Sequence, residues 1–531
     1  MPSHSGGSTA RRLVRAGLLL FGAATALVHL DLTVRRPDRP IFAFDSAEYA
    51  LAGRHLARTG TLATPFAHPA VLGKLDQPPF PLITGHPLVP LLDGALFAVG
   101  GPRPELTLIP PLLAYLGLIL LAAALAERLS GSLLAGALAG GAVACSRDLL
   151  RYAAEGMTEL PFTLAWTGAL LLLLLHRERP RPVVLGAALG LAHLARPVVG
   201  PLLPVWLVLL AWWTPPGRRL RTTAIALAGF APFAAALLLY KWLATGHPFT
   251  ESGAHLLLTG VAPELTVAFL NCSIPPPDPL AYLAAHPDRW LAKIATRGPE
   301  LLLAAFTRES LLVGVLLVSA ATAPQASVRR DFSRALLPLL IGMVALSTLT
   351  VPNARYVIPF APALWAVAVA EAFGLARAVG FRRVIAAALA GAVVVFGALY
   401  PTLRAWRHPT PVPFTERQWR GLGSALARSL PPGARVGSDI APWVAWYADR
   451  VAVLLPNTPA DLGALERELP LDALVVSNEW VIHQPGGRRW RDVFAGRERL
   501  PGWSTLAVIS SGDLRALVLA HADSLDHSPT F

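Results

Sequence analysis

The sequence predicts a polytopic α-helical membrane protein of about eleven transmembrane helices with a small C-terminal extracytoplasmic α/β domain. The chain of 531 residues has a mean hydropathy of +0.51, with 54% hydrophobic and 15% charged residues. Soluble domains carry about 25% charged residues, and the deficit here comes from long uncharged runs of the kind that span bilayers. These runs fill residues 13–401 with few breaks, and the pattern changes from about residue 402 onward.

The amino end is predicted to be cytoplasmic. Residues 1–12 are rich in Ser, Gly and Arg and are expected to be disordered. An apolar run from Leu13 to Leu32 follows, flanked by Arg11, Arg12 and Arg15. Because no small-residue cleavage site ends this run, it is interpreted as an uncleaved first helix rather than a signal peptide.

The remaining apolar runs set the number of spans. The run 88–101 is shorter than the roughly 20 residues that a spanning helix needs, so it is predicted to lie at the membrane surface or to re-enter it. Ten further runs bring the total with the first helix to eleven. They lie at about 106–126, 132–146, 159–175, 183–196, 198–213, 221–244, 310–323, 335–350, 357–375 and 384–401.

Arginine clusters give an independent check on orientation. If the chain starts in the cytoplasm and each predicted helix crosses the membrane once, all the arginine clusters between the runs lie on the cytoplasmic side, as the positive-inside rule expects. If the run 88–101 also crossed the membrane, all of these clusters would lie on the non-cytoplasmic side. The clusters include Arg128, Arg177, Arg179, Arg181, Arg218, Arg219, Arg221, Arg329, Arg330, Arg334, Arg377, Arg382 and Arg383. The loops 33–105, 147–158 and 245–309 and the tail are therefore predicted to be non-cytoplasmic.

The tail alternates short strand-like and helical segments after a Pro-rich linker, 401–413, which is typical of a small α/β domain. The predicted organisation is thus a membrane domain, 13–401, with a prominent first loop, 33–105, and a tail domain, 402–531. The predicted strands are 434–438, 451–455, 473–477 and 516–519, and the predicted helices are 415–429 and 461–468.

The placement of charge argues against a nucleic-acid-binding protein, and the cysteine content argues against a disulfide-stabilised one. The formal net charge of +13 would allow nucleic-acid binding, but the arginines occur in short clusters between apolar runs instead of one contiguous basic patch. Two cysteines, Cys145 and Cys272, are too few for a disulfide framework.

Acidic residues on the predicted outer face are the first candidates for catalysis. Asp45 and Glu48 stand three residues apart and would share one face of a helix. A carboxylate there can act as a general base, although a solvated charged loop is the alternative. Glu155 and Glu159 form a second acidic site, for which solvent exposure and helix capping, respectively, are the alternatives.

Basic residues on the same face are candidates for binding a phosphate. Arg54 and Lys74 lie in the first loop, Arg196 lies between two apolar runs, and Arg355 precedes Tyr356 at the outer start of a helix. Arginine and lysine neutralise phosphate well, so a phosphate-bearing lipid would explain several of them at once. Snorkelling of long side chains to the interface is the alternative for each.

These motifs together resemble the GT-C superfamily of membrane glycosyltransferases. The likeness is greatest to the protein O-mannosyltransferases and the lipid A aminoarabinose transferases, and it extends in order over nearly the whole chain. The first acidic motif of that superfamily resembles Asp45-Ser46-Ala47-Glu48-Tyr49, and its step into a juxtamembrane helix resembles Gly85-His86-Pro87-Leu88. Further similar segments are Ser146-Arg147 through Glu159, His193-Leu194-Ala195-Arg196-Pro197, Tyr240-Lys241-Trp242, Gly246-His247-Pro248-Phe249 and Arg355-Tyr356-Val357-Ile358-Pro359.

The resemblance implies a GT-C-like fold and an inverting transfer of a sugar from a polyprenyl phosphate to a protein, lipid or glycan acceptor outside the cytoplasm. It implies Asp45 as general base with Glu48 in reserve. The donor phosphate is then expected to lie near Arg355, Tyr356, Arg54, Lys74 and Arg196, with His86 and Tyr49 as loop or acceptor contacts.

The expected location is a bacterial inner membrane. No cofactor is expected, and a divalent metal is possible but not predicted. The sugar and the acceptor stay open, as does the choice between Glu155 and Glu159. A surface-polysaccharide ligase or polymerase, or a transporter of a lipid-linked sugar, is the alternative function.

Overall fold

The computed structural model describes residues 5–72, 77–82, 86–248, 256–261, 278–324, 327–380, 383–479 and 487–521. The chain forms two compact units, which we call the helical unit and the mixed unit. The helical unit comprises Met1–Arg35, Thr107–Leu238 and Ile294–Thr410. The mixed unit comprises Arg36–Leu106, Leu239–Lys293 and Pro411–Phe531, so the first loop belongs with the tail.

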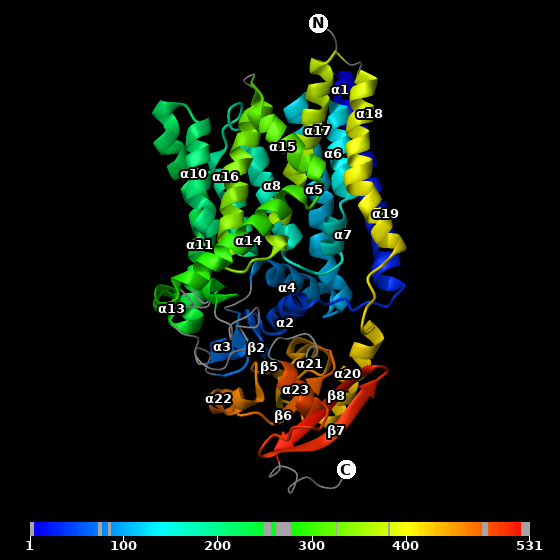
Figure 1. Ribbon diagram of the computed structural model, residues 1–531, viewed down its shortest axis with the longest axis vertical. Helices are drawn as coiled ribbons and strands as arrows, with labels where there is room; N and C mark the ends of the chain where they lie inside the picture. Colours follow the sequence, from blue (N-terminus) through cyan, green and yellow to red (C-terminus); the bar gives the residue numbers. More distant parts are fainter. Residues whose placement is uncertain are drawn as a thin grey trace. The chain divides into compact units, whose positions relative to one another are not determined.

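The helical unit is a bundle of long apolar helices (Figure 1). Its first part contains α1 (Ser5–Leu30), η1 (Asp31–Arg35), α5 (Ile109–Ser130), α6 (Leu133–Ala144), α7 (Arg147–Ala153), α8 (Glu159–Leu175), α9 (Pro182–Ala195), α10 (Val199–Trp213), η3 (Pro216–Arg218) and α11 (Arg219–Thr245). Its second part contains α14 (Pro287–Thr307), α15 (Leu311–Thr322), α16 (Val328–Leu349), η6 (Ala354–Phe360), α17 (Ala361–Ala378), α18 (Arg383–Val394), η7 (Val395–Leu399) and α19 (Tyr400–Arg407). The division between the units falls within α11 and α14.

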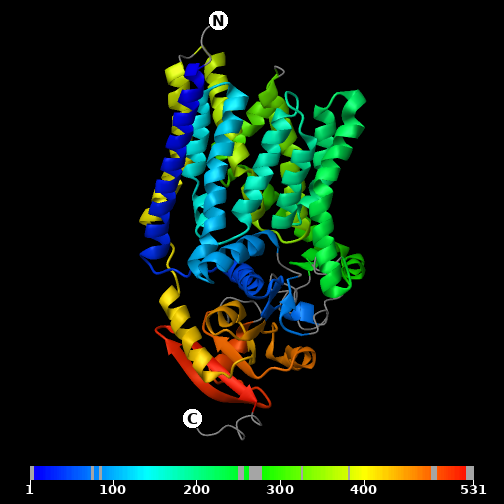
Figure 2. The same ribbon diagram turned by 180° about the vertical axis from the view of Figure 1, so that it is seen from behind.

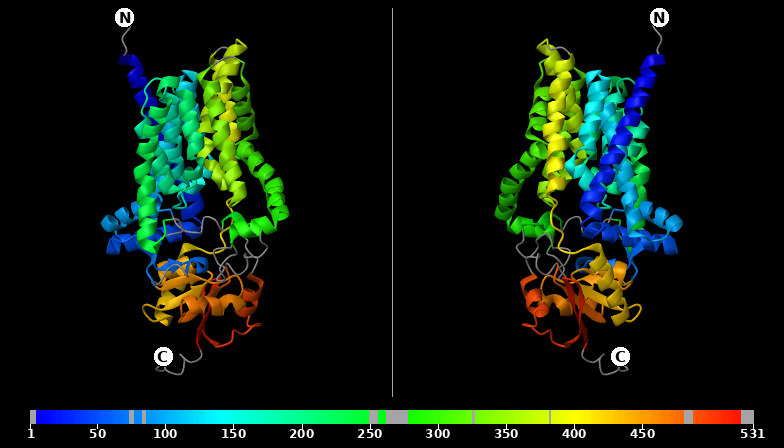
Figure 3. Two further views of the ribbon diagram at one scale, coloured as in Figure 1. Left: turned by 90° about the vertical axis from the view of Figure 1, so that its left-hand side faces the viewer. Right: turned by 90° about the vertical axis from the view of Figure 1, so that its right-hand side faces the viewer.

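Small residues allow the central helices to approach closely. A Cβ on Gly136 of α6 would lie 2.8 Å from the Ala123 carbonyl oxygen of α5, and a Cβ on Gly140 would lie 3.2 Å from that of Ile119. These two glycines are four residues apart on one helix face, the spacing that permits backbone contact between membrane helices. Helix α17 packs against α5, α6 and α15 and is almost wholly buried, whereas α1 lies on the outside of the bundle (Figures 2 and 3).

Each of the eleven apolar runs predicted to span the membrane forms a helix. Within the described residues, six helices are long and apolar enough to span, or up to eight if each of two bent helix pairs is one span. Helices α8, α9 and α10 are apolar but have only 17, 14 and 15 residues. The chain is therefore a multi-pass membrane protein, and the count of eleven spans stays a prediction.

The first helix begins earlier than predicted. Helix α1 starts at Ser5, so residues 5–12, which were expected to be disordered, are helical. Arg11 Nε donates to Glu127 Oε1 at 2.7 Å, which gives the polar start of α1 a partner on α5. An apolar pattern cannot reveal such an extension, because the added residues are mainly Ser, Gly, Thr and Arg.

The mixed unit contains a six-stranded sheet with helices on both faces. From the first loop and the middle of the chain come α2 (Phe44–Thr59), β1 (Ala63–Thr64), β2 (Phe66–Ala67), α3 (Pro69–Leu72), β3 (Phe80–Pro81), α4 (Leu88–Gly100), η2 (Pro104–Leu108, which crosses the unit boundary), η4 (Leu256–Leu258) and α13 (Pro279–Ala285). From the tail come α20 (Glu416–Ser429), β4 (Arg435–Ser438), α21 (Ala441–Tyr447), β5 (Val451–Leu454), η8 (Pro459–Asp461), α22 (Leu462–Glu468), β6 (Ala473–Ser477), α23 (Gly487–Phe494), β7 (Trp503–Ser511) and β8 (Leu514–His521).

The strand order is β2-β5-β4-β6-β8-β7. The pairs β2–β5, β5–β4 and β4–β6 are parallel, and β8 pairs antiparallel with both β6 and β7. Strand β2 comes from the first loop: Phe66 and Ala67 stand beside Ala452 and Val453 of β5. The first loop therefore completes one edge of the sheet that the tail forms, and β1 and β3 pair separately beside it.

Alternating side chains along the strands bury two cores, as the twofold period of a strand requires. On one face, Val436 and Val475 pack with α20, α21 and residues of α2, including Leu51. On the other face, Leu474 and Val476 pack with α22 and α23. Helix α2 is therefore a structural part of the same core as the tail.

Candidate active site

Glu159 in the helical unit is enclosed by two arginines and a tyrosine. It opens α8 and its side chain is only 1% exposed. Arg196, which caps the carboxyl end of α9, forms an ion pair through Nη2 with Glu159 Oε1 and donates from Nε to Thr158 Oγ1 at 3.2 Å. Arg355 in η6 places Nη1 3.9 Å from the same carboxylate oxygen.

Tyr356 lies beside both cations. The guanidinium carbon of Arg196 lies 5.2 Å from the centre of its ring, and that of Arg355 lies 5.6 Å from it. One carboxylate thus faces two guanidinium groups. The Arg355 side chain is 27% exposed whereas that of Arg196 is 6% exposed, so Arg355 is the cation that a ligand can reach.

Glu155 has a different environment from Glu159. It lies in the turn after α7, and its Oε1 accepts from Arg151 Nε at 2.8 Å, one helical turn earlier. The two glutamates left open by the sequence therefore differ: Glu159 is buried with the predicted cations, and Glu155 pairs with a local arginine.

Asp45 and Glu48 lie on the first two turns of α2 in the mixed unit, as the sequence predicts. Asp45 is in the first turn, where the helix dipole favours a carboxylate, and it is half-buried. Glu48 is buried, and its Oε2 lies 3.4 Å from Nε2 of His68. His68 was not predicted as a site residue.

Of the other first-loop candidates, two lie close together in the structure. Tyr49 is buried, and its ring lies 6.2 Å from that of His86, so these two predicted loop residues do come together. Lys74 lies outside the described residues.

Arg54 is used within the mixed unit. Its Nη1 donates to the Trp446 carbonyl at 3.0 Å, and Nη2 donates to the Ala445 carbonyl at 2.8 Å and pairs with Asp449 at 3.0 Å. Burial lowers the pKa of the Arg54 guanidinium to about 10; Asp449 opposes this shift and Arg58 adds to it. These contacts bind α2 to α21, so we interpret Arg54 as a structural residue instead of a phosphate ligand.

A second polar cluster in the helical unit was missed by the sequence analysis. Glu309, between α14 and α15, accepts from Ser146 Oγ at 3.1 Å and from Trp365 Nε1 at 2.9 Å. Arg308 forms an ion pair with Asp148 of α7. The available signal was the interruption of apolar sequence at 146–148 and 308–309, where two helix pairs bend by 58° and 89°.

Asp93 is an unusual buried carboxyl on α4. It is 0% exposed, and within the described part of the chain neither of its oxygens has a hydrogen-bond partner. Burial raises its pKa well above the usual range. A Cβ on Gly53 of α2 would lie only 2.8 Å from the Asp93 Cβ, so the closeness of the two helices seals this group from water.

No group of three His, Cys, Asp or Glu side chains suited to a metal ion is found among the residues whose positions the structure describes. The clusters at Glu159 and Glu48 each combine carboxylate with nitrogen bases or cations. Such an arrangement suits proton acceptance and binding of an anion.

The fold of the chain is similar to those of solved membrane glycosyltransferases, so the resemblance drawn from the sequence is confirmed at the level of the fold. The structure is similar to that of ArnT from Cupriavidus metallidurans bound to undecaprenyl phosphate, with a TM-score of 0.53 and 14% identity over 97% of this chain and 99% of that one.

It is also similar to the archaeal oligosaccharyltransferase AglB from Archaeoglobus fulgidus in complex with an inhibitory peptide and a dolichol-phosphate. The TM-score is 0.50 and the identity 13%, over 87% of this chain and 69% of the AglB chain. No protein-family model matches the sequence, and no curated protein matches it.

Proposed function

We propose that the protein is an inverting glycosyltransferase that moves a sugar from a polyprenyl-phosphate donor to an acceptor on the extracytoplasmic side of the membrane. The observation that supports this most is the cluster of Arg196 and Arg355 around Glu159, in a fold whose similar structures hold undecaprenyl phosphate or dolichol-phosphate. A departing lipid phosphate needs positive charge that is already in place, which such a cluster supplies.

The proposal gives each residue one role. Arg355 accepts the leaving phosphate, because it is the more exposed of the two arginines, and Arg196 with Glu159 holds it in position. Asp45 takes the proton from the acceptor hydroxyl as that oxygen attacks the anomeric carbon. The bond from that carbon to the phosphate oxygen breaks in the same step, which inverts the configuration.

We also propose eleven spans, with the amino end in the cytoplasm and residues 402–531 outside it. The location that goes with this topology is a bacterial inner membrane. The sugar can be mannose, aminoarabinose, another hexose or a pentose.

The test of the function is transfer of label by the purified full-length protein. It is incubated with polyprenyl phosphates that carry different labelled sugars and with protein, lipid and glycan fractions of the envelope. Label entering one fraction supports the proposal and names the acceptor class. If every donor is left intact although the protein is folded, the proposal is wrong.

Asp45→Asn tests the general base. General-base help is worth about 10²- to 10⁴-fold, so kcat should fall by that factor while the thermal unfolding temperature stays close to that of the unchanged protein. Asp31→Asn is the matched control, because Asp31 lies in η1 of the helical unit and has no role in the proposed reaction. Near-full transfer by the Asp45→Asn variant would refute this role for Asp45.

A second candidate is a ligase that transfers a preassembled glycan. The likeness to AglB, an oligosaccharyltransferase, favours it. The two candidates separate in the same assay when donors with one sugar and with several sugars are compared. A preference for the longer donor favours the ligase.

A further inference from the structure

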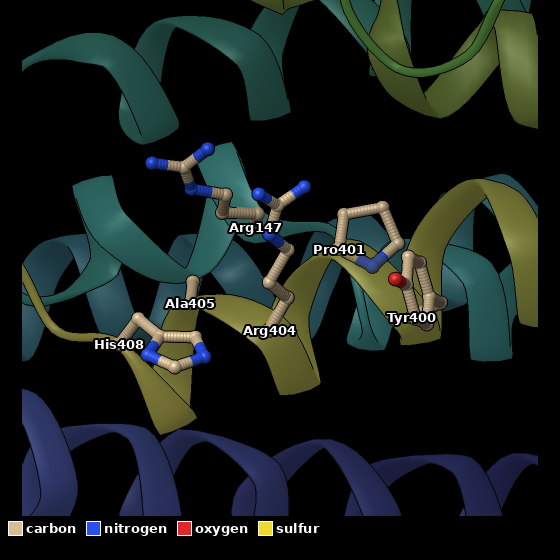
Figure 4. A pocket seen from close by; sticks show the side chains of 6 residues that line it. All are labelled: Arg147, Tyr400, Pro401, Arg404, Ala405 and His408. Carbon is tan, nitrogen blue, oxygen red and sulfur yellow. The ribbon is translucent and has the colours of Figure 1, made fainter.

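A pocket of about 420 Å³ lies in the helical unit between α7 and α19 (Figure 4). It is lined by Arg147 from the start of α7 and by Tyr400, Pro401, Arg404, Ala405 and His408 from α19 and its end. None of these residues belongs to the cluster at Glu159.

The lining of the pocket is positively charged. Arg147 and Arg404 carry full charges, and no carboxylate lines the pocket. Figure 4 shows both guanidinium groups on the same side of α19. Neither arginine side chain forms an ion pair or hydrogen bond with any residue that the structure describes, whereas nearby Arg151 and Arg308 pair with Glu155 and Asp148.

Both walls of the pocket are fixed in place. Thr402 Oγ1 donates to the Cys145 carbonyl just before α7, and Trp406 Nε1 donates to His29 Nδ1 of α1 at 3.0 Å. The two arginines therefore project from anchored helices. Holding two like charges beside one pocket is unfavourable in the absence of an anion, and an anion between them would relieve the repulsion.

The pocket also lies near the end of a candidate membrane span. The segment Val384–Arg407 has the length and apolarity of a spanning helix, and Arg404 is near its carboxyl end. Phe396 is 72% and Tyr400 58% exposed on the same segment, so apolar surface adjoins the charged pocket. A lipid offers the matching pair of groups, with an anionic phosphate beside acyl chains.

We propose that this pocket binds the phosphate of an anionic membrane lipid, with Arg147 and Arg404 contacting the phosphate oxygens and the chains lying along Phe396 and Tyr400. The site is separate from the proposed donor site and does not depend on transferase activity.

The alternative is that these arginines only extend their long side chains to the membrane interface. In that case any arginine at the end of this helix would contribute equally to lipid binding. Arg407 is exposed, lies on the same helix and does not line the pocket, so it is the matched control.

The experiment measures lipid retention by the full-length protein in neutral detergent. Phosphatidylglycerol or phosphatidylcholine is titrated, and bound lipid is counted by native mass spectrometry. Each basic residue near anionic lipid is worth about 1 kcal/mol, so Arg147→Gln and Arg404→Gln should each weaken phosphatidylglycerol binding about fivefold, and the double variant about 25-fold. Arg407→Gln should change it less than twofold, and phosphatidylcholine should bind weakly throughout.

Two further arms identify the source of the phosphate. Displacement of phosphatidylglycerol by undecaprenyl phosphate would support the proposal, because both lipids share the phosphate and the apolar chain. Equal displacement by inorganic phosphate would overturn it, because chains would then add nothing. Equal losses in Arg407→Gln and Arg147→Gln would also overturn it, and unfolding temperatures show that each variant is folded.

Discussion

The two arginines beside Glu159 differ in burial, and this difference predicts different consequences of replacing them. Arg196→Gln leaves a buried carboxylate without its close partner, and breaking a buried pair costs about 3–5 kcal/mol. Arg355→Gln removes a partly exposed charge 3.9 Å away, which should cost less than about 1 kcal/mol of stability. Its effect should appear in kcat, with a loss of about 10²- to 10³-fold if it stabilises the leaving phosphate.

The measurement pairs thermal unfolding with single-turnover transfer for each variant. The double variant Arg196→Gln with Glu159→Gln should regain part of the lost stability, because no uncompensated charge remains. If Arg355→Gln proved as unstable as Arg196→Gln and kept its kcat, Arg355 would be a packing residue and the phosphate role would be wrong.

Residue identity and order predicted Glu159, Arg196 and Arg355 as candidates, but not that they meet. Their mutual contact depends on the packing of α8 with α9 and η6, which no local pattern encodes. His68 shows the same limit, since its partner Glu48 lies 20 residues away on another element. Asp93 was passed over because one acidic residue in an apolar run does not reveal whether it is buried.

At the scale of the element, Asp93 gives α4 a dependence on pH. Burial raises its pKa well above the usual range of an aspartate, and α4 lies outside the spans that we propose. The folded state then binds more protons than the unfolded chain, so stability falls as pH rises above about 4 until the folded-state pKa is passed. Each unit of difference costs about 1.4 kcal/mol.

Asp93→Asn removes this titration with little change in shape. The variant should be more stable than the unchanged protein at neutral pH, and the two should converge near pH 4. Thermal unfolding followed across that range is the measurement, with Asp492→Asn as the control, because the Asp492 side chain on α23 is 37% exposed. A constant difference at all pH values would mean that Asp93 does not titrate in this range.

A helix or strand could be predicted from the sequence where its own residues carry the pattern of that element. Strands β4, β5, β6 and β8 and helices α20 and α22 lie where the short strand-like and helical segments of the tail predicted them. Strand β2 has two residues and forms only because β5 offers an unpaired edge. Helix α14 was missed because it is amphipathic and contains Pro299, so its apolar residues never form an uninterrupted run.

At the scale of the whole molecule, sequence order and spatial grouping differ. The apolar content separates residues 13–401 from the tail, yet the compact units join Arg36–Leu106 to Pro411–Phe531. The physical reason is burial, because Phe42, Leu51 and Phe66 of the first loop share one core with Trp419 and Trp443 of the tail. Hydropathy reports how apolar a segment is, but it does not report which other segment of the chain it packs against.

Because of this shared core, a destabilising substitution in the tail should also destabilise α2. Trp419 stacks on Trp443 with ring centres 5.0 Å apart and belongs to the same core as Leu51. Trp419→Ala should cost about 3–5 kcal/mol and lower the protection of α2 amides against hydrogen exchange, and with it the transfer that depends on Asp45.

Trp490→Ala is the matched control, since Trp490 belongs to the core on the opposite face of the sheet, to which α2 contributes no residue. It removes a buried tryptophan of equal size, so its cost in stability should be similar while the exchange of α2 amides changes little. Hydrogen exchange followed by mass spectrometry over residues 44–59 compares the two variants. Equal exchange of α2 in both would mean that the mixed unit opens as a whole, and that α2 depends on its global stability instead of on the face that it shares with α20 and α21.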